Sequence, residues 1–378
     1  MAKTKILYLI SSLAQGGAER HLVDLVRGLD PGRFESEICV LGDKSHFEGE
    51  LPEGQPRHRL RARTWASPLA FARLVATVRA VRPAILHTYM NDANLWGRLA
   101  TWFGCRPRIV TSVHLDEMPI VYRWLERPLS RRADRIVAHS RSIERLLVDG
   151  LAVPSARVRL IPNGVDVERF QPLSAAARQS ARGALGIDTQ AFVALMPARI
   201  SPQKNQVLVI MALAQLRASG ELPETFRLLL AGRVSSVGFA RKLRSSIERA
   251  GLGGQVRLLG AVREMRELYA AADVVLMPSR TEASPIAALE ALACGVPVLI
   301  SAAANTDQVL VAGQHGWQID LATPVAIADA LREILATPAE SLRLKGAAAR
   351  AYVLRRFSSE RVVDDFVQLY EALSPAPG

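Results

Sequence analysis

The sequence predicts an α/β protein built from two doubly wound, Rossmann-like domains. Short apolar segments alternate with longer segments of helical periodicity, which is typical of a parallel sheet covered by helices on both faces. The alternation is interrupted over residues 163–188 and then resumes. Because 378 residues exceed one typical domain and suffice for two, we expect an N-terminal domain over residues 1–165 and a C-terminal domain over residues 166–378.

The elements of the first domain follow from short apolar segments that predict strands, each followed by a segment with helical spacing. The predicted strands are residues 5–10, 34–41, 84–88, 109–113 and 135–139. The predicted helices are residues 17–29, 68–81, 91–103, 120–131 and 142–147. A strand over residues 158–162 and a turn over residues 163–166 follow.

The second domain begins after a polar, helix-prone stretch over residues 170–187. Its predicted strands are residues 192–197, 226–231, 256–259, 274–277 and 296–300, with helices between them. The last helical pattern, residues 359–373, fits either domain, including packing back on the first. Two such domains are expected to face a central cleft lined by the carboxyl ends of their strands, where open α/β sheets bind ligands.

Composition restricts the class of protein. Apolar residues make up 49% of the chain and charged residues 22%, as in ordinary globular proteins. Cys39, Cys105 and Cys294 are too far apart for a disulfide framework or a metal-ligand motif and fit a reducing compartment. The apolar N-terminal run is short and lacks a cleavage context, and no run approaches the roughly 20 apolar residues of a membrane span. We therefore expect a cytoplasmic protein.

The net charge of +12 is concentrated in the first domain, where residues 1–165 contain 25 Lys and Arg but 16 Asp and Glu. Such a surface attracts phosphates of nucleic acid, anionic lipid or a substrate, and charge alone does not choose among them. Basic runs occur over residues 57–63 and 122–132, the second with Trp124 among its arginines. That pattern fits a helix on a membrane surface, and it equally fits a solvated helix face.

The first strand is followed by Gly16 and Gly17, directly before a predicted helix. Paired glycines let the backbone turn tightly and approach a ligand, and a helix N-terminus offers free N–H groups to an anion. The pattern is not the G-x-G-x-x-G fingerprint of dinucleotide sites. A simple tight turn explains the two glycines equally well.

Arg199 and Lys204 follow the strand over residues 192–197 and flank Pro202 at the start of a helix. An arginine can donate two parallel hydrogen bonds to phosphate oxygens, a lysine supplies a point charge, and the helix end adds N–H donors. Their position at the carboxyl end of a strand favours a phosphate site over a pair of solvated surface charges.

Glu282 and Glu290 lie in an otherwise apolar segment. Ser284 and Pro285 are predicted to be the N-cap and first residue of a helix that contains Glu290 and ends before the strand over residues 296–300. Helical spacing would separate the carboxylates by about 12 Å, more than the roughly 5–9.5 Å of a glycosidase pair. Without a nearby His or Asp cluster for a metal, we interpret the two glutamates as hydrogen-bond acceptors for an extended polar ligand.

Two histidines end predicted strands at the expected ligand edge. His114 follows the strand over residues 109–113, and His87 ends the strand over residues 84–88. A lone histidine is usually structural, so only position suggests a functional role, and both residues compete for it.

Together these motifs resemble the family-4 retaining glycosyltransferases of the GT-B fold, over essentially the whole chain. The resemblance rests on Gly16-Gly17-Ala-Glu19-Arg20, the interdomain run 161–170, Arg199 with Lys204, Ala231-Gly232, the run 268–279, and Glu282-x7-Glu290 followed by Ala-Leu-Ala-Cys-Gly-Val-Pro-Val. Each motif is weak alone, but the set in this order and spacing is specific.

The resemblance implies a role for each matched residue. Arg199 and Lys204 would bind the donor diphosphate, Glu282 the donor sugar, Glu290 the ribose, and His114 would lie near the transferred sugar. The implied catalytic residues are Glu282, Arg199, Lys204 and His114, and the implied donor-binding residues are Gly16, Gly17, Arg199, Lys204, Glu282, Ala283, Ser284, Pro285, Ile286 and Glu290. Attack from the front side, with the departing phosphate accepting the proton, would need neither a metal nor another cofactor.

The resemblance also implies partners. These are a UDP- or GDP-linked sugar and an acceptor that is a polysaccharide, a lipopolysaccharide or lipid-linked. From the basic character of the first domain we expect peripheral contact with the anionic inner face of the plasma membrane, and we expect no nucleic-acid partner. Ala283 replaces the family's common glycine, and residues 301–307 lack its usual paired glycines, so the sugar is not defined. The alternatives are a nucleotide-sugar epimerase or phosphorylase of the same fold, and a non-catalytic binder of nucleic acid or anionic lipid.

Overall fold

The computed structural model describes residues 3–14, 16–43, 45–62, 67–104, 106–114, 120–282 and 284–374. The chain forms two compact units. Unit 1 contains residues 1–164 together with 359–378, and unit 2 contains residues 165–358. The C-terminal helix α13 (Ser359–Leu373) therefore belongs to unit 1, although it follows unit 2 in the sequence.

Unit 1 contains a seven-stranded parallel sheet with the strand order β3-β2-β1-β4-β5-β6-β7. Its strands are β1 (Thr4–Ile10), β2 (Phe34–Val40), β3 (Arg57–Arg59), β4 (Ile85–Tyr89), β5 (Arg108–Val113), β6 (Arg135–Ala138) and β7 (Val158–Leu160). Its other helices are α1 (Gly17–Gly28), α2 (Pro68–Val81), α3 (Asn91–Ala100), α4 (Ile120–Leu129) and α5 (Arg141–Arg145).

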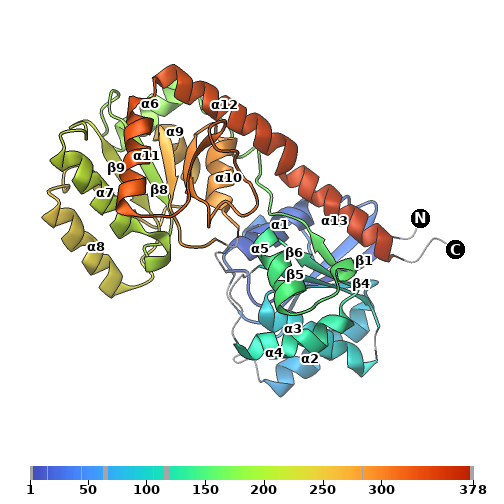
Figure 1. Ribbon diagram of the computed structural model, residues 1–378. Coiled ribbons are helices and arrows are strands. Elements are labelled where there is room, and N and C mark those ends of the chain that lie inside the picture. The colour runs from blue at the N-terminus through green and yellow to red at the C-terminus, as the bar shows by residue number, and fades with distance from the viewer. Residues whose placement is uncertain are drawn as a thin grey trace. The chain divides into compact units, whose positions relative to one another are not determined.

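The sheet of unit 1 contributes apolar side chains to a core on each of its faces. Alternate residues of a strand point to opposite sides of the sheet, so one strand can supply both cores. In β1, Tyr8 and its alternate neighbours join the core formed with α1 and α13, while Leu7 and Leu9 join the core formed with α2 and α3. Figure 1 shows α13 and the α2–α4 group on opposite sides of this sheet. The helices therefore cover both faces, as the sequence predicts.

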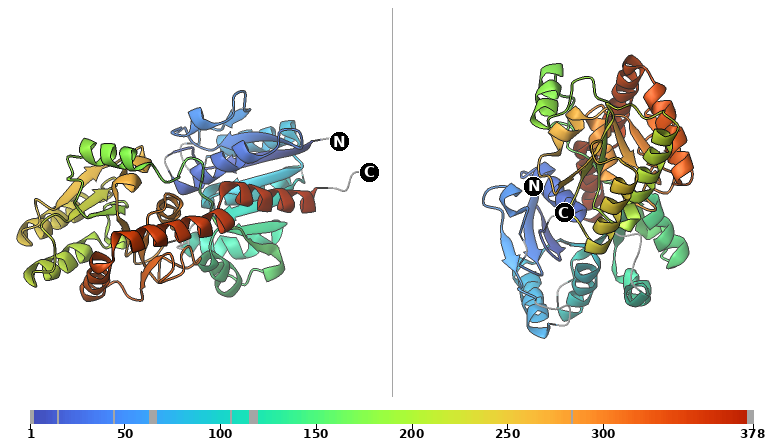
Figure 2. Two further views of the ribbon diagram at one scale, coloured as in Figure 1. Left: turned by 90° about the horizontal axis from the view of Figure 1, so that it is seen from above. Right: turned by 90° about the vertical axis from the view of Figure 1, so that its left-hand side faces the viewer.

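Hydrogen bonds fasten α13 to the first strand at two levels. The Tyr8 and Tyr370 hydroxyls lie 3.2 Å apart in the core, and the Thr4 and Ser374 hydroxyls lie 3.2 Å apart at the end of the helix. Both views in Figure 2 show the start of β1 beside the end of α13. The last helix is thus an integral part of the N-terminal core.

Unit 2 contains a six-stranded parallel sheet with the order β10-β9-β8-β11-β12-β13. Its strands are β8 (Val193–Pro197), β9 (Arg227–Ala231), β10 (Val256–Gly260), β11 (Val274–Met277), β12 (Val298–Ser301) and β13 (Gly316–Ile319). Its helices are α6 (Ala175–Ala184), α7 (Gln206–Ala218), α8 (Val237–Arg249), α9 (Met265–Ala271), α10 (Ile286–Ala293), α11 (Pro324–Ala336) and α12 (Ala339–Arg356). The prediction of two parallel α/β domains is confirmed.

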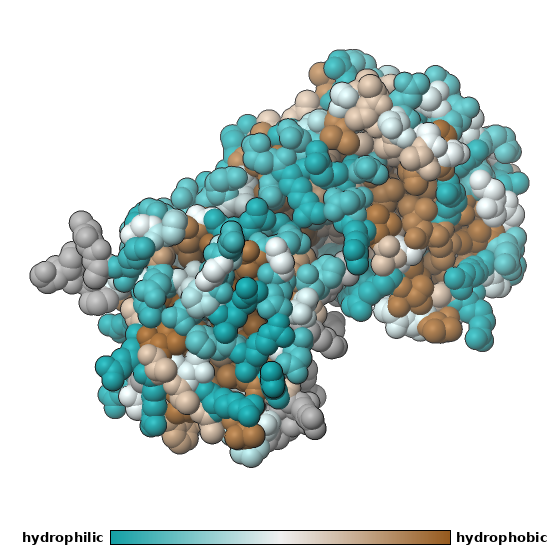
Figure 3. Space-filling model, turned by 180° about the vertical axis from the view of Figure 1, so that it is seen from behind, coloured by the Kyte–Doolittle hydropathy of each residue, from teal (hydrophilic) through white to brown (hydrophobic). Residues whose placement is uncertain are grey.

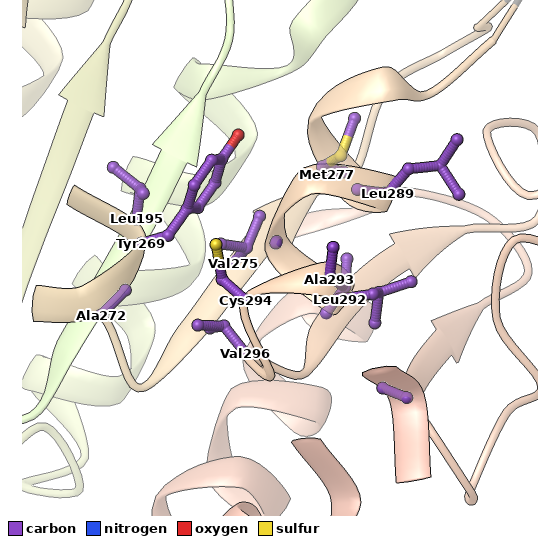
Figure 4. Close-up of a cluster of buried hydrophobic side chains, with 14 of the residues drawn as sticks. Leu195, Tyr269, Ala272, Val275, Met277, Leu289, Leu292, Ala293, Cys294 and Val296 are labelled. Atoms are coloured by element: carbon purple, nitrogen blue, oxygen red, sulfur yellow. The ribbon is translucent and has the colours of Figure 1, made fainter. Parts of the chain in front are cut away.

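The core of unit 2 also has two layers, one on each face of its sheet. In β8, Leu195 contributes to the layer under α9, α10 and α12, and Met196 to the layer under α7, α8 and α11. Figure 4 shows part of the first layer, in which Leu195, Val275 and Tyr269 lie among the side chains around α10. This packing fixes α10 on one face of the sheet.

The face of the protein that is seen from behind is largely hydrophilic, with an apolar area on unit 2 (Figure 3). In the part of the chain that the structure describes, no helix combines the length and apolar character needed to cross a bilayer.

Candidate functional site

The central feature of unit 2 is a close ion pair between two residues that the sequence analysis singles out. Strands β8 and β11 are parallel neighbours, so the loops after them meet at one edge of the sheet. There the Lys204 ammonium lies 2.5 Å from Oε1 of Glu282. Their side chains are only 12% and 9% exposed. The Ser279 hydroxyl donates a further hydrogen bond to the same Oε1, at 2.7 Å.

The two loops are joined by two side-chain to backbone hydrogen bonds and by one bond between backbone groups. The Asn205 amide donates to the Pro278 carbonyl at 2.7 Å, the Gln203 amide donates to the Thr281 carbonyl at 3.1 Å, and the Arg280 N–H donates to the Gln203 carbonyl at 2.9 Å. Asn205 has a left-handed backbone with φ of 60°, a conformation that asparagine tolerates better than most residues. These bonds fix the backbone on both sides of the ion pair.

Glu290 lies on α10 and is oriented by a buried tyrosine. The Tyr269 hydroxyl donates a 2.7 Å hydrogen bond to Oε2 of Glu290. Burial raises the pKa of Tyr269 well above its usual value, and the neighbouring carboxylate raises it further, so the hydroxyl keeps its proton. Figure 4 shows Tyr269 in the apolar layer beneath the helix. Glu290 can therefore still accept hydrogen bonds from a ligand.

The start of α10 differs from the sequence prediction. The helix begins at Ile286 with Pro285 in the N-cap position, and no side-chain hydrogen bond caps it, so the predicted N-cap at Ser284 is wrong. The reason is local, because the Ile286 N–H already bonds to the Ser284 carbonyl in a tight turn before the helix. Ser284 is partly exposed and Pro285 is buried. Ala283 lies outside the described residues.

Arg199 has a fixed backbone and an exposed side chain. Its carbonyl accepts a 2.7 Å hydrogen bond from the Gln206 amide. A Cβ at Gly232 would lie 2.0 Å from the Ala198 carbonyl oxygen and 2.9 Å from the Arg199 nitrogen. Glycine at position 232 thus permits the close backbone approach that places Arg199 at the end of β8.

In unit 1, Gly16 and Gly17 form the beginning of α1, where the helix end already faces a carboxylate of its own. A Cβ at Gly16 would lie 2.3 Å from Oε2 of Glu19, and the Ser12 hydroxyl donates to Oε1 of Glu19 at 3.2 Å. Glu19 is buried. Gly16 therefore lets the Glu19 carboxylate approach the backbone, so an anionic ligand would compete with this carboxylate at the helix end.

His114 follows β5 and lies between two aromatic rings. Its ring stacks on His139 at 4.0 Å and on Tyr89 at 5.4 Å, with His21 edge-on at 5.5 Å. Burial lowers the pKa of His114 well below its usual value, and His21 and His87 lower it further. Among the described residues, its buried Nε2 has no hydrogen-bond partner. His114 is thus held in place as a neutral ring.

His87 is in a different position from its competitor His114. It is fully buried, with Nδ1 2.7 Å from the Tyr370 hydroxyl and Nε2 2.9 Å from the Ser112 hydroxyl. Ser112 also lies 3.1 Å from Nε2 of His139. Both nitrogens of His87 are therefore engaged within the core, and it ties α13 to β5.

The histidines also raise the question of a metal site. His21, His114 and His139 each offer one nitrogen, and these atoms lie within 4.8 Å of one another. A metal needs lone pairs that converge, and these lie in the ring planes. The rings of His114 and His139 are stacked with an interplanar angle of only 19°, so their lone pairs lie in nearly parallel planes, and both nitrogens of His139 already have partners in the Ile161 carbonyl and the Ser112 hydroxyl. In this arrangement the cluster does not form a metal centre.

Tyr269 and Ser279 lie in the run 268–279 that carries the resemblance, but no role was predicted for them, nor for Asn205, Gln203 or the histidines at 21 and 139. One sequence pattern could have predicted the turn at Asn205, since an asparagine before an apolar helical segment suits a left-handed turn. His21 and His139 come from α1 and the end of β6, and only the folded sheet brings them to His114.

Two family models match the chain, one on each half. The model described as Glycosyltransferase Family 4 matches residues 15–169, and the model described as Glycosyl transferases group 1 matches residues 177–351.

Similar curated proteins are glycosyltransferases. The D-inositol 3-phosphate glycosyltransferase of Geodermatophilus obscurus is 33% identical over 252 residues, covering 65% of this chain and 54% of that protein. The UDP-Gal:α-D-GlcNAc-diphosphoundecaprenol α-1,3-galactosyltransferase of Escherichia coli is 25% identical over 295 residues, covering 76% and 74%. The chain thus spans about half the length of the inositol-phosphate relative.

Similar solved structures share the fold of the whole chain. The structure of Anabaena HepE in complex with UDP and glucose matches with a TM-score of 0.85 at 22% identity, covering 98% of this chain and 100% of that one. The structure of WaaG, a glycosyltransferase involved in lipopolysaccharide biosynthesis, matches with a TM-score of 0.72 at 17% identity, covering 95% and 99%. The fold is therefore that of GT-B glycosyltransferases.

Proposed function

This chain belongs to glycosyltransferase family 4, and from that premise we propose that it transfers a hexosyl group, with retention, from a UDP- or GDP-linked sugar to an acceptor of the cell envelope. The observation that carries the proposal is the Lys204–Glu282 pair at the carboxyl edge of the sheet in unit 2. It combines, at one point, a cation for phosphate and an acceptor for hydroxyl groups.

In this proposal the donor lies along the edge of the unit 2 sheet. Arg199 and Lys204 bind the diphosphate, Glu282 accepts hydrogen bonds from the sugar, and Glu290 accepts them from the ribose. The loop before α10, with Ser284 and Pro285, borders the donor. Support comes from the exposed guanidinium of Arg199, the tied loops around Lys204 and the Tyr269 hydroxyl that orients Glu290.

The chemistry of the step follows from these charges. Cleavage of the donor leaves negative charge on the diphosphate, and cations held in place before the reaction stabilise that charge without reorganising. The acceptor attacks from the face that the phosphate leaves, and a departing phosphate oxygen takes the acceptor proton. We propose that neither a metal nor a separate enzymic base takes part.

The acceptor is proposed to approach unit 1 near His114 and the Gly16–Gly17 turn. A neutral imidazole can exchange hydrogen bonds with a sugar hydroxyl without carrying charge. The Escherichia coli relative acts on a sugar linked to diphosphoundecaprenol. That name supports a polyprenyl diphosphate-linked glycan as the first acceptor to test.

A direct test is transfer from a panel of UDP-, GDP- and ADP-sugars to lipid-linked and oligosaccharide acceptors, followed by mass spectrometry. We expect turnover with at least one UDP- or GDP-sugar, retention of the anomeric configuration, and unchanged rates in EDTA. A donor that binds the native state also raises the melting temperature, more so the tighter it binds. If no donor shifted the melting temperature or turned over, the proposed function would be wrong.

Contact with an anionic membrane is proposed through the surface around the end of α3. Arg132 lies over the Trp102 ring at 5.0 Å, and the two line a hollow with Arg106. No acidic residue is among the described residues that line it. Phe103, which follows Trp102 in the sequence, is exposed, and Trp124 is 79% exposed on α4, a helix in contact with α3. Aromatic side chains beside arginines that have no ion pair among the described residues suit the headgroup region of an anionic bilayer.

We therefore expect Arg132→Ala to weaken binding to vesicles containing phosphatidylglycerol about fivefold, since one basic residue contributes about 1 kcal/mol near such a surface. Trp124→Ala should act in the same direction. The measurement is co-sedimentation with vesicles of phosphatidylglycerol and phosphatidylcholine, compared with phosphatidylcholine alone. The control is Leu321→Ala, which removes a residue 73% exposed on unit 2. Equal binding of the Arg132 variant and wild type would exclude this surface.

A further inference from the structure

One carboxylate oxygen in unit 2 holds the cation that the donor diphosphate needs. Oε1 of Glu282 accepts from the Lys204 ammonium at 2.5 Å and from the Ser279 hydroxyl at 2.7 Å. The Ser279 carbonyl accepts a 2.6 Å hydrogen bond from the Ser301 hydroxyl on β12, so Ser279 is itself anchored. The pair is therefore a nearly buried contact in which one carboxylate oxygen has two donors.

We propose that Glu282 is an internal competitor of the donor diphosphate. In the protein without ligand its carboxylate neutralises Lys204, and a nucleoside diphosphate binds fully only when it displaces that carboxylate. The inference rests on the proposed function and adds to it a mechanism for binding the donor and releasing the nucleoside diphosphate product. Ser279 is the positioning residue that keeps the carboxylate directed at Lys204.

The competition gives the site a way to distinguish an intact donor from the spent product. An intact donor brings sugar hydroxyls, which give Glu282 new partners and leave Lys204 to the phosphates. After transfer the sugar has gone, and Glu282 has lost those partners. It returns to Lys204 and Ser279, which weakens the hold on the nucleoside diphosphate. The same glutamate therefore favours binding of the sugar-bearing donor and release of the product.

The test is calorimetric titration of the full-length protein with UDP and with GDP. Glu282→Gln keeps the size and hydrogen-bonding capacity of the side chain and removes its charge. We expect it to bind UDP or GDP about tenfold more tightly than wild type, which corresponds to about 1.4 kcal/mol. A residue that only contacted the donor would give the opposite result or none. The matched control is Glu340→Gln, which removes an exposed carboxylate on α12.

A double-mutant cycle separates competition for Lys204 from simple repulsion of phosphate by Glu282. Lys204→Ala should weaken binding, and adding Glu282→Gln to it should then give no tightening. If the tightening persisted in the Lys204→Ala background, or if Glu282→Gln alone did not tighten binding, the competitor role would be overturned. Absence of UDP and GDP binding to wild type would instead count against the proposed function itself.

Discussion

Replacing Lys204 with alanine is expected to lower kcat for sugar transfer at least about a hundredfold, the usual effect of removing one preorganised group that stabilises transition-state charge. The ammonium is held at the carboxyl edge of β8 by loops whose backbones are tied together. Because leaving-group charge develops on the diphosphate, the loss should be larger in kcat/KM than in donor binding alone. Steady-state kinetics with the preferred donor measures both.

The control for this experiment is Lys242→Ala, which removes an exposed lysine on α8. We expect it to keep wild-type kinetics. Removing Lys204 leaves the nearly buried Glu282 carboxylate without its cation, so unfolding of each variant should be followed by circular dichroism to show that the fold is retained. A folded Lys204 variant with more than half of the wild-type kcat would exclude the assigned role.

Most of the fold could be predicted because its strands are buried on both faces and are therefore continuously apolar. Two strands were not predicted because they lack such a continuous apolar sequence. Strand β3, with the sequence Arg-His-Arg, lies at the edge of its sheet, where charged side chains face water and deter pairing with other chains. Strand β13 begins with Gly316, where a Cβ would lie 2.1 Å from the Val298 carbonyl oxygen, and it too is an edge strand.

The site was predictable only in part. Lys204 and Glu282 follow strands that a doubly wound sheet makes neighbours, so position alone brings them to one edge. What fixes them is a set of contacts to backbone carbonyls, such as the Asn205 bond to Pro278, and a carbonyl has no sequence signature. The start of α10 was misplaced because a turn at Ser284 satisfies backbone groups that the prediction gave to a side-chain cap.

Replacing His21 with leucine is expected to stabilise unit 1, and more so as the pH falls. His21 is 7% exposed, and among the described residues neither of its nitrogens has a hydrogen-bond partner. Removing an unsatisfied buried polar group should gain about 1–3 kcal/mol at neutral pH. Burial lowers the pKa of His21 to about 3, so the folded state keeps it neutral while the unfolded state binds a proton below about pH 6.5.

The sign of the pH effect follows from that difference. A histidine whose pKa is depressed in the folded protein supports stability above its unfolded pKa, and this contribution is lost as the pH falls from about 6.5 toward 3. Each such group changes the free energy of unfolding by about 1.4 kcal/mol per pH unit in that window. His87 and His139, whose pKa values burial also lowers, should add to the slope.

Hydrogen exchange at pH 7, 6 and 5 measures the free energy of unfolding of each unit separately. Separate values are needed because the two units need not unfold together. The free energy of unfolding obtained from amides of β4 and β5 should be higher in His21→Leu than in wild type. This difference should grow by about 1.4 kcal/mol per pH unit below pH 6.5. Amides of β8 in unit 2 serve as the internal reference, and His46→Gln, at an exposed histidine, is the control variant. An advantage that stayed constant with pH would mean that His21 is already protonated in the fold. Burial lowers the pKa of His21, and the aromatic rings of Tyr89, His139 and Phe366 lie against it, which is why we expect the neutral form.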